Sequence, residues 1–518
     1  MKKSIINVFL ILILVLTPYS YTLVGRVKAQ EKEEYYIVSV VVQASKESLV
    51  PENHPIIVRL RDIAAALPKN VDPFGGKTTT EEDDVDWKAV TVLYKGRVIP
   101  SQIDDLDLNG FSPEDELAFL TVSQIPAGES SEYQIFIPLK ASNLPEVAFE
   151  TKVKINEYRL LEEIKKGSPE FMSEAYEISN GLIVGVVAVK AAWMSGGIFS
   201  ILINSSGYDV VKQGSEYMSL LWKWSRLFCP ADPGWIEHNP NAATGGGKVV
   251  YMKEGPVRGI ISVVLESQYH NITDLYPVFT YYLYANHTWI YTMLDITGSN
   301  AKPGMFLEVN LANREWGGIG CGGKYSLVII NGAGNFSRTD DVNVPVSEIK
   351  EGWYVSLDPN NGTGFGFIFP TTGLDSVKWS FDDEGIHTYY TAMTFPYKSI
   401  IVVFDKTVTS NPLEYVKTIY NEYYIHAPNV IVKPAVKITQ LPAALSQMKE
   451  IFELQKQIAE LEKMISNLSK EITRLTSVKS VLEIVVYRTR ILLLVAAIIL
   501  FLIGYVAGRG YVYRRKRR

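Results

Sequence analysis

The 518-residue chain is poor in the residue types that most often build metal centres and disulfide scaffolds. It holds only 2 cysteines and 6 histidines. Two cysteines exclude a disulfide-framework fold and a Cys-rich zinc or iron–sulfur site, and so few histidines leave little room for a His-rich catalytic metal centre. No G-x-S-x-G, H-E-x-x-H or P-loop pattern occurs in the sequence. The familiar signatures of serine hydrolases, metalloproteases and nucleotide-binding enzymes are therefore missing.

Basic residues are also scarce in the central part of the chain. Lys and Arg number 51 against 56 Asp and Glu, and ten of the basic residues lie in segments 1–29 and 509–518, which contain no acid. The centre therefore carries a net charge of −15, which does not suit a nucleic-acid binder. A hydrophobic content of 47% and a charged content of 21% exclude a mostly disordered protein, and the length allows two or three domains.

The N-terminal segment is hydrophobic behind a basic start. Ile5 to Leu16 form an apolar run after Lys2 and Lys3, and Val27-Lys28-Ala29 offers the small residues of a signal-peptidase site. We predict a signal peptide over residues 1–29, with an uncleaved N-terminal anchor as the alternative. In both cases the residues that follow are exported.

A second hydrophobic segment lies near the C-terminus. Residues 491–508 contain no charged side chain and would span roughly 27 Å as a helix, enough to cross a hydrocarbon core. The positive-inside rule places the basic tail, residues 509–518, in the cytoplasm. We predict a single-pass type I protein of the cell membrane with an extracellular ectodomain.

A strict seven-residue period precedes this segment. Isoleucine at a and leucine at d recur through four heptads without proline or glycine: Ile451, Leu454, Ile458, Leu461, Ile465, Leu468, Ile472 and Leu475. This spacing predicts a left-handed coiled coil over residues 444–484 rather than a lone amphipathic helix on a globular core. Because the heptads run into the membrane segment, the copies must be parallel. No asparagine occupies an a position, so both a dimer and a trimer stay open.

The segment from residue 30 to residue 425 is dominated by short alternating or β-branched runs separated by Gly and Asn turns such as Asn109-Gly110. This pattern is typical of antiparallel sandwiches. We predict a mainly β fold with an N-terminal β-sandwich (30–150) and a larger β-sandwich or supersandwich (170–425). A proline-containing extended hinge (426–443) then leads to the parallel coiled coil and the single transmembrane helix.

Several short motifs carry a resemblance to a known family. They are Val98–Asp105 with Asp115-Glu116-Leu117, and Gly196-Gly197-Ile198 with Gly255–Arg258. These motifs resemble a family of secreted carbohydrate-associated proteins, a domain of unknown function related to polysaccharide lyases. The resemblance covers about residues 50–420 and implies a galactose-mutarotase-like β-supersandwich. Separately, the order of β-domains, coiled coil and membrane helix resembles the stalk proteins that anchor archaeal S-layers.

The acidic segment that follows the first motif has the spacing of a calcium loop. Side-chain oxygens fall at positions 1, 3, 5 and 12, and Gly110 occupies position 6. We predict Ca²⁺ ligation by Asp105, Asp107, Asn109 and Glu116. The flanking residues alternate as strands do, so the loop would lack the helices of an EF-hand. Asp104 and Asp115 are spare carboxylates that could replace a ligand, and a solvated acidic turn is the alternative.

Aromatic and polar residues gather around the cysteines. His238 lies near Cys229, and Arg314 lies near Cys321. In an oxidising compartment we expect these cysteines to form a disulfide, which would bring both groups together. A polysaccharide lyase acting on an acidic glycan needs a base for the proton beside the uronate carboxyl and a cation to stabilise the resulting charge. His238, Arg314 and Tyr390 are the candidate catalytic residues, with an ordinary aromatic core as the alternative.

Export also makes glycosylation relevant. The chain contains N-x-S/T sequons at Asn204, Asn271, Asn286, Asn335, Asn361 and Asn467. We predict a glycosylated surface; Asn467 falls at a c position of the heptads, where a glycan would face solvent.

Two classes of function follow from these patterns. The first is a non-catalytic, membrane-anchored cell-envelope protein that associates with itself through the coiled coil, as an S-layer-type stalk or a glycan-associated surface protein. The second is a membrane-tethered polysaccharide lyase or glycan-binding receptor. The stalk and anchor are the stronger patterns, so we favour the first, with a surface-layer protein or an envelope glycan as its partner.

Overall fold

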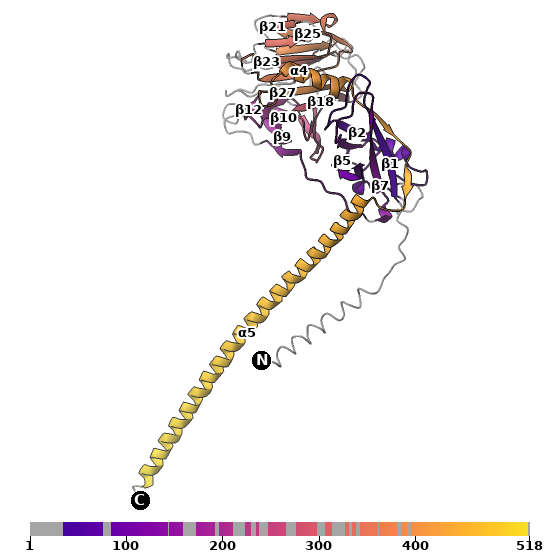
Figure 1. Cartoon of the computed structure of the whole chain (residues 1–518). Coiled ribbons are helices and arrows are strands. Elements are labelled where there is room, and N and C mark those ends of the chain that lie inside the picture. The colour runs from indigo at the N-terminus through magenta and orange to yellow at the C-terminus, as the bar shows by residue number, and fades with distance from the viewer. Residues whose placement is uncertain are drawn as a thin grey trace. The chain divides into compact units, whose positions relative to one another are not determined.

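The computed structural model describes residues 35–75, 84–142, 144–158, 172–191, 196–210, 223–228, 235–237, 247–265, 276–297, 306–312, 327–330, 334–337, 342–360, 362–380, 385–390 and 395–515. It confirms a mainly β fold followed by a long C-terminal helix (Figure 1). The described strands form five sheets in which neighbouring strands run antiparallel. The predicted signal peptide lies outside the described residues.

The N-terminal β-domain consists of two sheets and a short helix. The first sheet has the order β28-β1-β7-β3-β4, with β29 also paired to β1, and the second has the order β2-β6-β5. Its strands before residue 140 are β1 (Tyr35–Gln43), β2 (Pro55–Arg59), β3 (Thr91–Tyr94), β4 (Arg97–Ile99), β5 (Ser101–Asp104), β6 (Glu116–Leu120) and β7 (Ser130–Pro138), and its helix is α2 (Leu60–Ala66). Val38, Val40 and Val42 alternate into the core between the sheets, which is why β1 forms as a strand here.

The segment predicted as an extended hinge contributes strands to this domain. β28 (Asn429–Val432) pairs with Val40–Gln43, and β29 (Val436–Ile438) pairs with Tyr35–Ile37. Pro434 falls between the two short strands, where its missing N–H removes no ladder hydrogen bond. Figure 1 shows these orange strands beside the indigo strand β1. Four residues separate the end of β29 from the start of helix α5 (Ala443–Arg515), so in the chain this helix closely follows the N-terminal β-domain.

The second part, here called the β-body, contains three sheets. Their orders are β12-β11-β10-β9-β8, β14-β13-β19-β26-β25-β22 and β15-β16-β17-β18-β27-β24-β23-β20-β21. The strands of the first are β8 (Lys154–Glu157), β9 (Met172–Ser179), β10 (Ile183–Ala191), β11 (Ile198–Ile203) and β12 (Tyr208–Asp209). Those of the second are β13 (Lys223–Phe228), β14 (Trp235–Glu237), β19 (Phe306–Ala312), β22 (Val342–Pro345), β25 (Leu374–Ser380) and β26 (Gly385–Tyr390). Those of the third are β15 (Gly247–Lys253), β16 (Arg258–Leu265), β17 (Tyr276–Tyr284), β18 (Trp289–Thr297), β20 (Leu327–Ile330), β21 (Gly334–Ser337), β23 (Trp353–Leu357), β24 (Gly364–Ile368) and β27 (Tyr397–Phe404).

The third sheet is covered on both faces. Along β27, Ile401 and Val403 enter the core shared with the other two sheets. Ile400 and Val402 belong to a different buried cluster, in which they pack with Val416 of α4 (Pro412–Ile419). Figure 1 shows α4 beside β27. A π-helical turn, η6 (Tyr420–Ile425), continues α4. A strand buried on both faces is expected to be apolar at consecutive positions, and the β27 sequence YKSIIVVF has this pattern.

Helix α5 (Ala443–Arg515) forms a separate unit of the chain. Its 73 residues correspond to about 110 Å at about 1.5 Å per residue. Among the described residues it is the one helix whose length and composition would allow it to cross a membrane. The predicted coiled-coil segment (444–484) and the whole predicted membrane segment (491–508) therefore lie on one continuous helix.

Candidate functional site

Two of the sequence motifs, more than 150 residues apart, meet in a buried hydrogen-bond network. Gln102 of β5 accepts hydrogen bonds at Oε1 from the backbone N–H groups of Val257 and Arg258, each at 3.0 Å. Its Nε2 donates to Asp104 Oδ1 at 2.7 Å and to the carbonyl oxygen of Arg258 at 3.1 Å. A Cβ on Gly255 would lie 2.0 Å from Gln102 Oε1, so glycine permits this close approach. The contact joins the N-terminal β-domain to the β-body.

Arg258 is the centre of this network and is only 2% exposed. Its Nε donates to Asp104 Oδ2 at 2.9 Å, and its Nη2 donates to Glu116 Oε2 at 2.6 Å. Its Nη1 donates to the Tyr284 hydroxyl at 3.1 Å. Burial alone disfavours the charge, but Tyr284, Asp104 and Glu116 together raise the pKa of Arg258 well above its ordinary value. The guanidinium is therefore charged, and it compensates carboxylates from both ends of the acidic loop.

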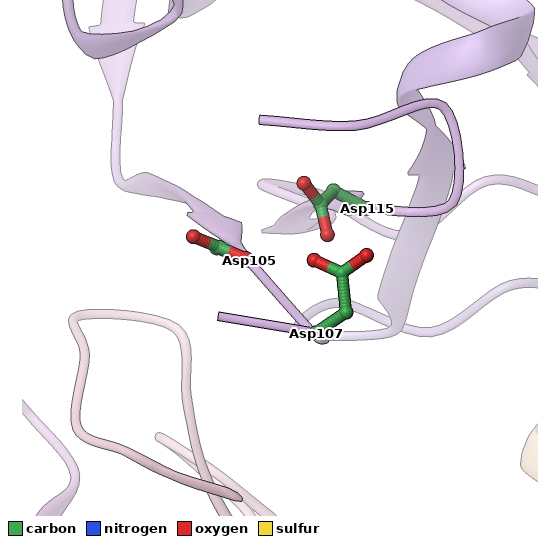
Figure 2. Close-up of side chains that lie close together, drawn as sticks. All are labelled: Asp105, Asp107 and Asp115. Atoms are coloured by element: carbon green, nitrogen blue, oxygen red, sulfur yellow. The ribbon is translucent and has the colours of Figure 1, made fainter. Parts of the chain in front are cut away.

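The acidic loop, residues 105–115, connects β5 to β6. Asp105, Asp107 and Asp115 each offer a carboxylate oxygen within 4.8 Å of the others. Figure 2 shows the carboxylates of Asp107 and Asp115 pointing toward one another, with Asp105 beside them. The turn is held by hydrogen bonds from Gly110 N to Asp105 Oδ2 at 3.1 Å and from Asn109 Nδ2 to Asp107 Oδ2 at 2.7 Å. Gly110 has φ 97°, a conformation that glycine adopts without strain.

Asp115 is the buried member of the group. Its two oxygens accept hydrogen bonds from Leu106 N at 2.8 Å and Ser112 N at 2.7 Å. Burial raises its pKa, the two backbone donors oppose that shift, and the nearby charges of Asp105 and Asp107 add to it. The Oδ1 atom of Asp105 is buried and has no hydrogen-bond partner among the described residues. This arrangement concentrates negative charge in a small volume.

Arginines form ion pairs with the carboxylates on either side of the loop and with one carboxylate inside it but, among the described residues, not with the others. Arg258 pairs with Asp104 and Glu116, and the exposed Glu114 lies 3.6–3.7 Å from Arg59 and Arg61. Within the described part of the chain, no lysine or arginine forms an ion pair with the three carboxylates that lie together: Asp105, Asp107 and Asp115. These are the carboxylates that a cation would compensate.

The structure brings together three of the four predicted calcium ligands and separates the fourth. Asp105, Asp107 and Asn109 share the turn, whereas the carboxylate of Glu116 binds Arg258. Asp115 takes the place beside the other two aspartates. Successive side chains at a strand start point to opposite sides, so Asp115 and Glu116 cannot both face the loop. That alternation is the signal that could have favoured Asp115.

Most of the predicted catalytic residues lie outside the described residues. His238, Arg314, Cys229 and Cys321 fall in segments that the structure does not describe. Tyr390 ends β26, where its backbone pairs with Leu307 of β19. The structure therefore brings no catalytic set together among the described residues.

The predicted glycosylation sites also lie partly inside and partly outside the described residues. Asn271 and Asn361 lie outside the described residues, and Asn335 lies on β21, where only the backbone is described. Asn204, Asn286 and Asn467 are exposed. The amide of Asn286 donates to Asn53 Oδ1 at 2.8 Å, so a glycan there would lie beside the contact between the N-terminal β-domain and the β-body.

Two histidines that the sequence patterns did not single out lie at this same contact. His287 Nε2 lies 3.0 Å from the carbonyl oxygen of Asn53; because a carbonyl only accepts, Nε2 carries the proton. The buried Nδ1 has no hydrogen-bond partner in the described part of the chain. His287 stacks on Trp289 with ring centroids 4.1 Å apart, and His54 stacks on Tyr423 at 5.0 Å. Burial lowers the pKa of His287 to about 3 and that of His54 to about 4.

The lowered pKa values of these two buried histidines predict that acid reduces the stability of the folded protein. Unfolded histidine titrates near pH 6.5, so below that pH the unfolded chain binds more protons than the folded chain. The free energy of unfolding should fall from about pH 6.5 down to about pH 3, by up to about 1.4 kcal/mol per pH unit for each histidine. We expect His287→Gln, whose Nε2 can still donate to Asn53, to reduce this slope in urea unfolding between pH 4 and pH 7. An unchanged slope would show that His287 is not a source of the acid sensitivity.

Comparison with solved structures finds distant likenesses. No protein-family model matches the chain, and no curated protein matches it. An alpha-mannosidase from Enterococcus faecalis superposes with a TM-score of 0.41 and 10% identity, over 78% of this chain and 46% of that one. A glycosyl hydrolase family 38 protein from the same organism has a TM-score of 0.41 and 12% identity, over 79% and 49%. A galactose mutarotase-like protein from Clostridium acetobutylicum has a TM-score of 0.32 and 9% identity, over 49% and 98%.

The match spans about half the length of the two Enterococcus chains. At TM-scores below 0.5 the likenesses are too distant to carry a substrate or a catalytic residue over to this chain.

Proposed function

We propose that this chain is a membrane-anchored surface protein whose β-rich ectodomain stands on a parallel, oligomeric coiled-coil stalk. The observation that carries the proposal is the apolar seam of helix α5, formed by the eight a and d residues from Ile451 to Leu475. These side chains are 51–65% exposed on the single chain. A stripe of large aliphatic residues with a seven-residue period is expected to be buried against a second helix of the same kind.

The membrane segment supports a copy of the same chain as the partner. Because helix α5 continues without interruption from the seam into residues 491–504, neighbouring copies in one bilayer have parallel helices in the same register. Hydrophobic burial along the seam then favours association without any further component. A dimer and a trimer both satisfy this geometry.

The isolated stalk provides a direct test of the seam. We expect a peptide spanning residues 443–480 to be helical and oligomeric at micromolar concentration, since four Ile/Leu heptads bury a continuous apolar core. Circular dichroism and sedimentation equilibrium measure both properties. A helical content that does not depend on concentration, together with a monomer mass, would remove the stalk from the proposal.

We further propose that the stalk holds the ectodomain within a surface layer or another glycan-rich envelope. The order of β-domains, stalk and membrane anchor supports this proposal, as does the resemblance of the β-domain motifs to carbohydrate-associated proteins. A 41-residue coiled-coil segment would separate ectodomain and bilayer by about 60 Å at about 1.5 Å per residue. We propose that the stalk serves to keep the ectodomain at this distance from the bilayer.

The acidic loop is proposed to bind Ca²⁺. The residues fit a hard cation, because Asp105, Asp107 and Asp115 supply carboxylate oxygens from one short segment and have no basic partner in the described part of the chain. Asn109, in the same turn, could add an amide oxygen. Glu116, bound to Arg258, is not part of the proposed ligand set.

Calcium should therefore stabilise the folded ectodomain. We expect millimolar CaCl₂ to raise its melting temperature by several degrees, because an ion that binds only the folded state adds its binding free energy to stability. Asp105→Asn with Asp107→Asn should abolish the response. The control is Glu114→Gln, which lies in the same loop but pairs with surface arginines. An equal response in the aspartate variant would exclude this site.

A further inference from the structure

We infer that the acidic loop and the Arg258 network form one coupled device, in which a divalent cation bound to the loop strengthens the docking of the N-terminal β-domain on the β-body. This inference rests on the cation site proposed above and assigns it a regulatory role.

The two ends of the acidic loop are covalently continuous with the two carboxylates that bind Arg258. Asp104, which binds Arg258, directly precedes Asp105, and Asp115 directly precedes Glu116, the second carboxylate bound to Arg258. Both ends of the loop are therefore fixed by one guanidinium that belongs to the β-body. A change in the spacing of Asp105 and Asp115 must be transmitted to Asp104 and Glu116 through a single peptide bond at each end.

Three carboxylates of the loop lie together without a basic partner among the described residues. The charge of Arg258 is balanced by Asp104 and Glu116, so it does not compensate Asp105, Asp107 and Asp115. Carboxylate oxygens of these three aspartates lie within 4.8 Å of one another. Like charges at this distance repel strongly when they are partly desolvated. A divalent cation would remove that repulsion, and the loop could then hold its two ends at the spacing that Arg258 requires.

The β-body also contacts β5, the strand from which the acidic loop begins. Tyr251 of β15 is 4% exposed, and its hydroxyl has no hydrogen-bond partner among the described residues. Burial raises the pKa of the Tyr251 hydroxyl; the charge of Asp104, followed by those of Asp105 and Asp115, adds to this shift, and Arg258 opposes it. Lys253 on the same strand donates to the Ile103 carbonyl oxygen at 2.8 Å. The β-body therefore contacts the strand from which the loop begins, while the turn from Asp107 to Gly110 is exposed.

The wild-type protein carries its own reporters of this coupling. The backbone N–H groups of Val257 and Arg258 donate to Gln102 across the contact, so they exchange with solvent hydrogen when the contact opens. We expect saturating CaCl₂ to slow their exchange about tenfold in the intact ectodomain, measured by hydrogen–deuterium exchange. The amides of β27, in the centre of the β-body, are the control and should not respond.

The coupling must also work in the opposite direction. Gln102→Ala removes the clamp on Val257 and Arg258 but leaves every proposed ligand in place, and we expect it to weaken Ca²⁺ binding about five- to tenfold in isothermal titration calorimetry. The matched control is Lys433→Ala, which removes an exposed ion pair with Glu132 elsewhere in the N-terminal β-domain.

The outcomes separate the two proposals. If calcium binds to the wild-type protein but leaves the exchange of Val257 and Arg258 unchanged, the cation site stands and the coupling is wrong. If calorimetry detects no binding of Ca²⁺, the cation site itself falls and the coupling falls with it. If Gln102→Ala does not fold, the exchange measurement on the wild-type protein still decides between these results.

Discussion

Replacing Ile465 and Leu468 by aspartate is expected to abolish the proposed self-association of the segment 30–488, which holds the β-domains and the proposed stalk, and to leave it monomeric. The two changes place charges at neighbouring a and d positions, where every copy would have to bury them without a partner. The loss should be complete at micromolar concentration in sedimentation velocity. The melting temperature of the β-domains should be unchanged, because helix α5 forms a unit of its own.

The control for this experiment places the same charges on the outer face of the helix. Ser466→Asp with Thr473→Asp adds two carboxylates at b positions and should leave the oligomer intact. In cells, the seam variant should lose the surface-layer attachment proposed above, whereas the control should keep it. If both variants remain oligomeric, association does not use the a/d seam.

Replacing Arg258 by methionine is expected to destabilise the ectodomain by about 3–5 kcal/mol, because it leaves the buried Asp104 and the partly buried Glu116 without a counter-charge. Urea unfolding measures this change. Arg258→Lys should cost less, since it keeps the charge but loses the forked geometry that contacts Asp104, Glu116 and Tyr284 together.

An exposed arginine on the same domain provides the comparison. Arg59 is 3.7 Å from Glu114, and both side chains are about half exposed or more. Arg59→Met should therefore change stability by less than about 1 kcal/mol. Equal effects of Arg59→Met and Arg258→Met would mean that the buried network does not hold the two parts of the protein together.

The fold class followed from local patterns, because each is a property of a short segment. Alternation such as Val38, Val40 and Val42 reports a strand with one buried face, and an uncharged run such as residues 491–508 reports a helix that can cross a membrane. The pairing of the proline-rich segment with β1 was not predictable in this way. Prolines indicate an extended chain, but they do not specify the distant edge strand to which it binds.

The candidate site was only partly predictable for a related reason. The spacing of Asp105, Asp107 and Asn109 is local and identified the acidic turn. The role of Arg258 depends on a contact with Asp104 across 154 residues, and the sequence presents the two motifs separately. Glu116 fits the twelfth position of a calcium loop by spacing alone; only the three-dimensional arrangement directs its carboxylate to Arg258.

The stalk is the centre of this account, and site-specific disulfide formation in the membrane tests it most directly. A cysteine at Leu468, a d position, should form a disulfide with the same residue of a neighbouring copy, because d side chains face each other across a parallel seam. A cysteine at Lys470, on the outer face, should not, and the chain without an added cysteine gives the background. We predict a crosslinked species for Leu468→Cys alone, whereas equal crosslinking of Leu468→Cys and Lys470→Cys would contradict the parallel stalk.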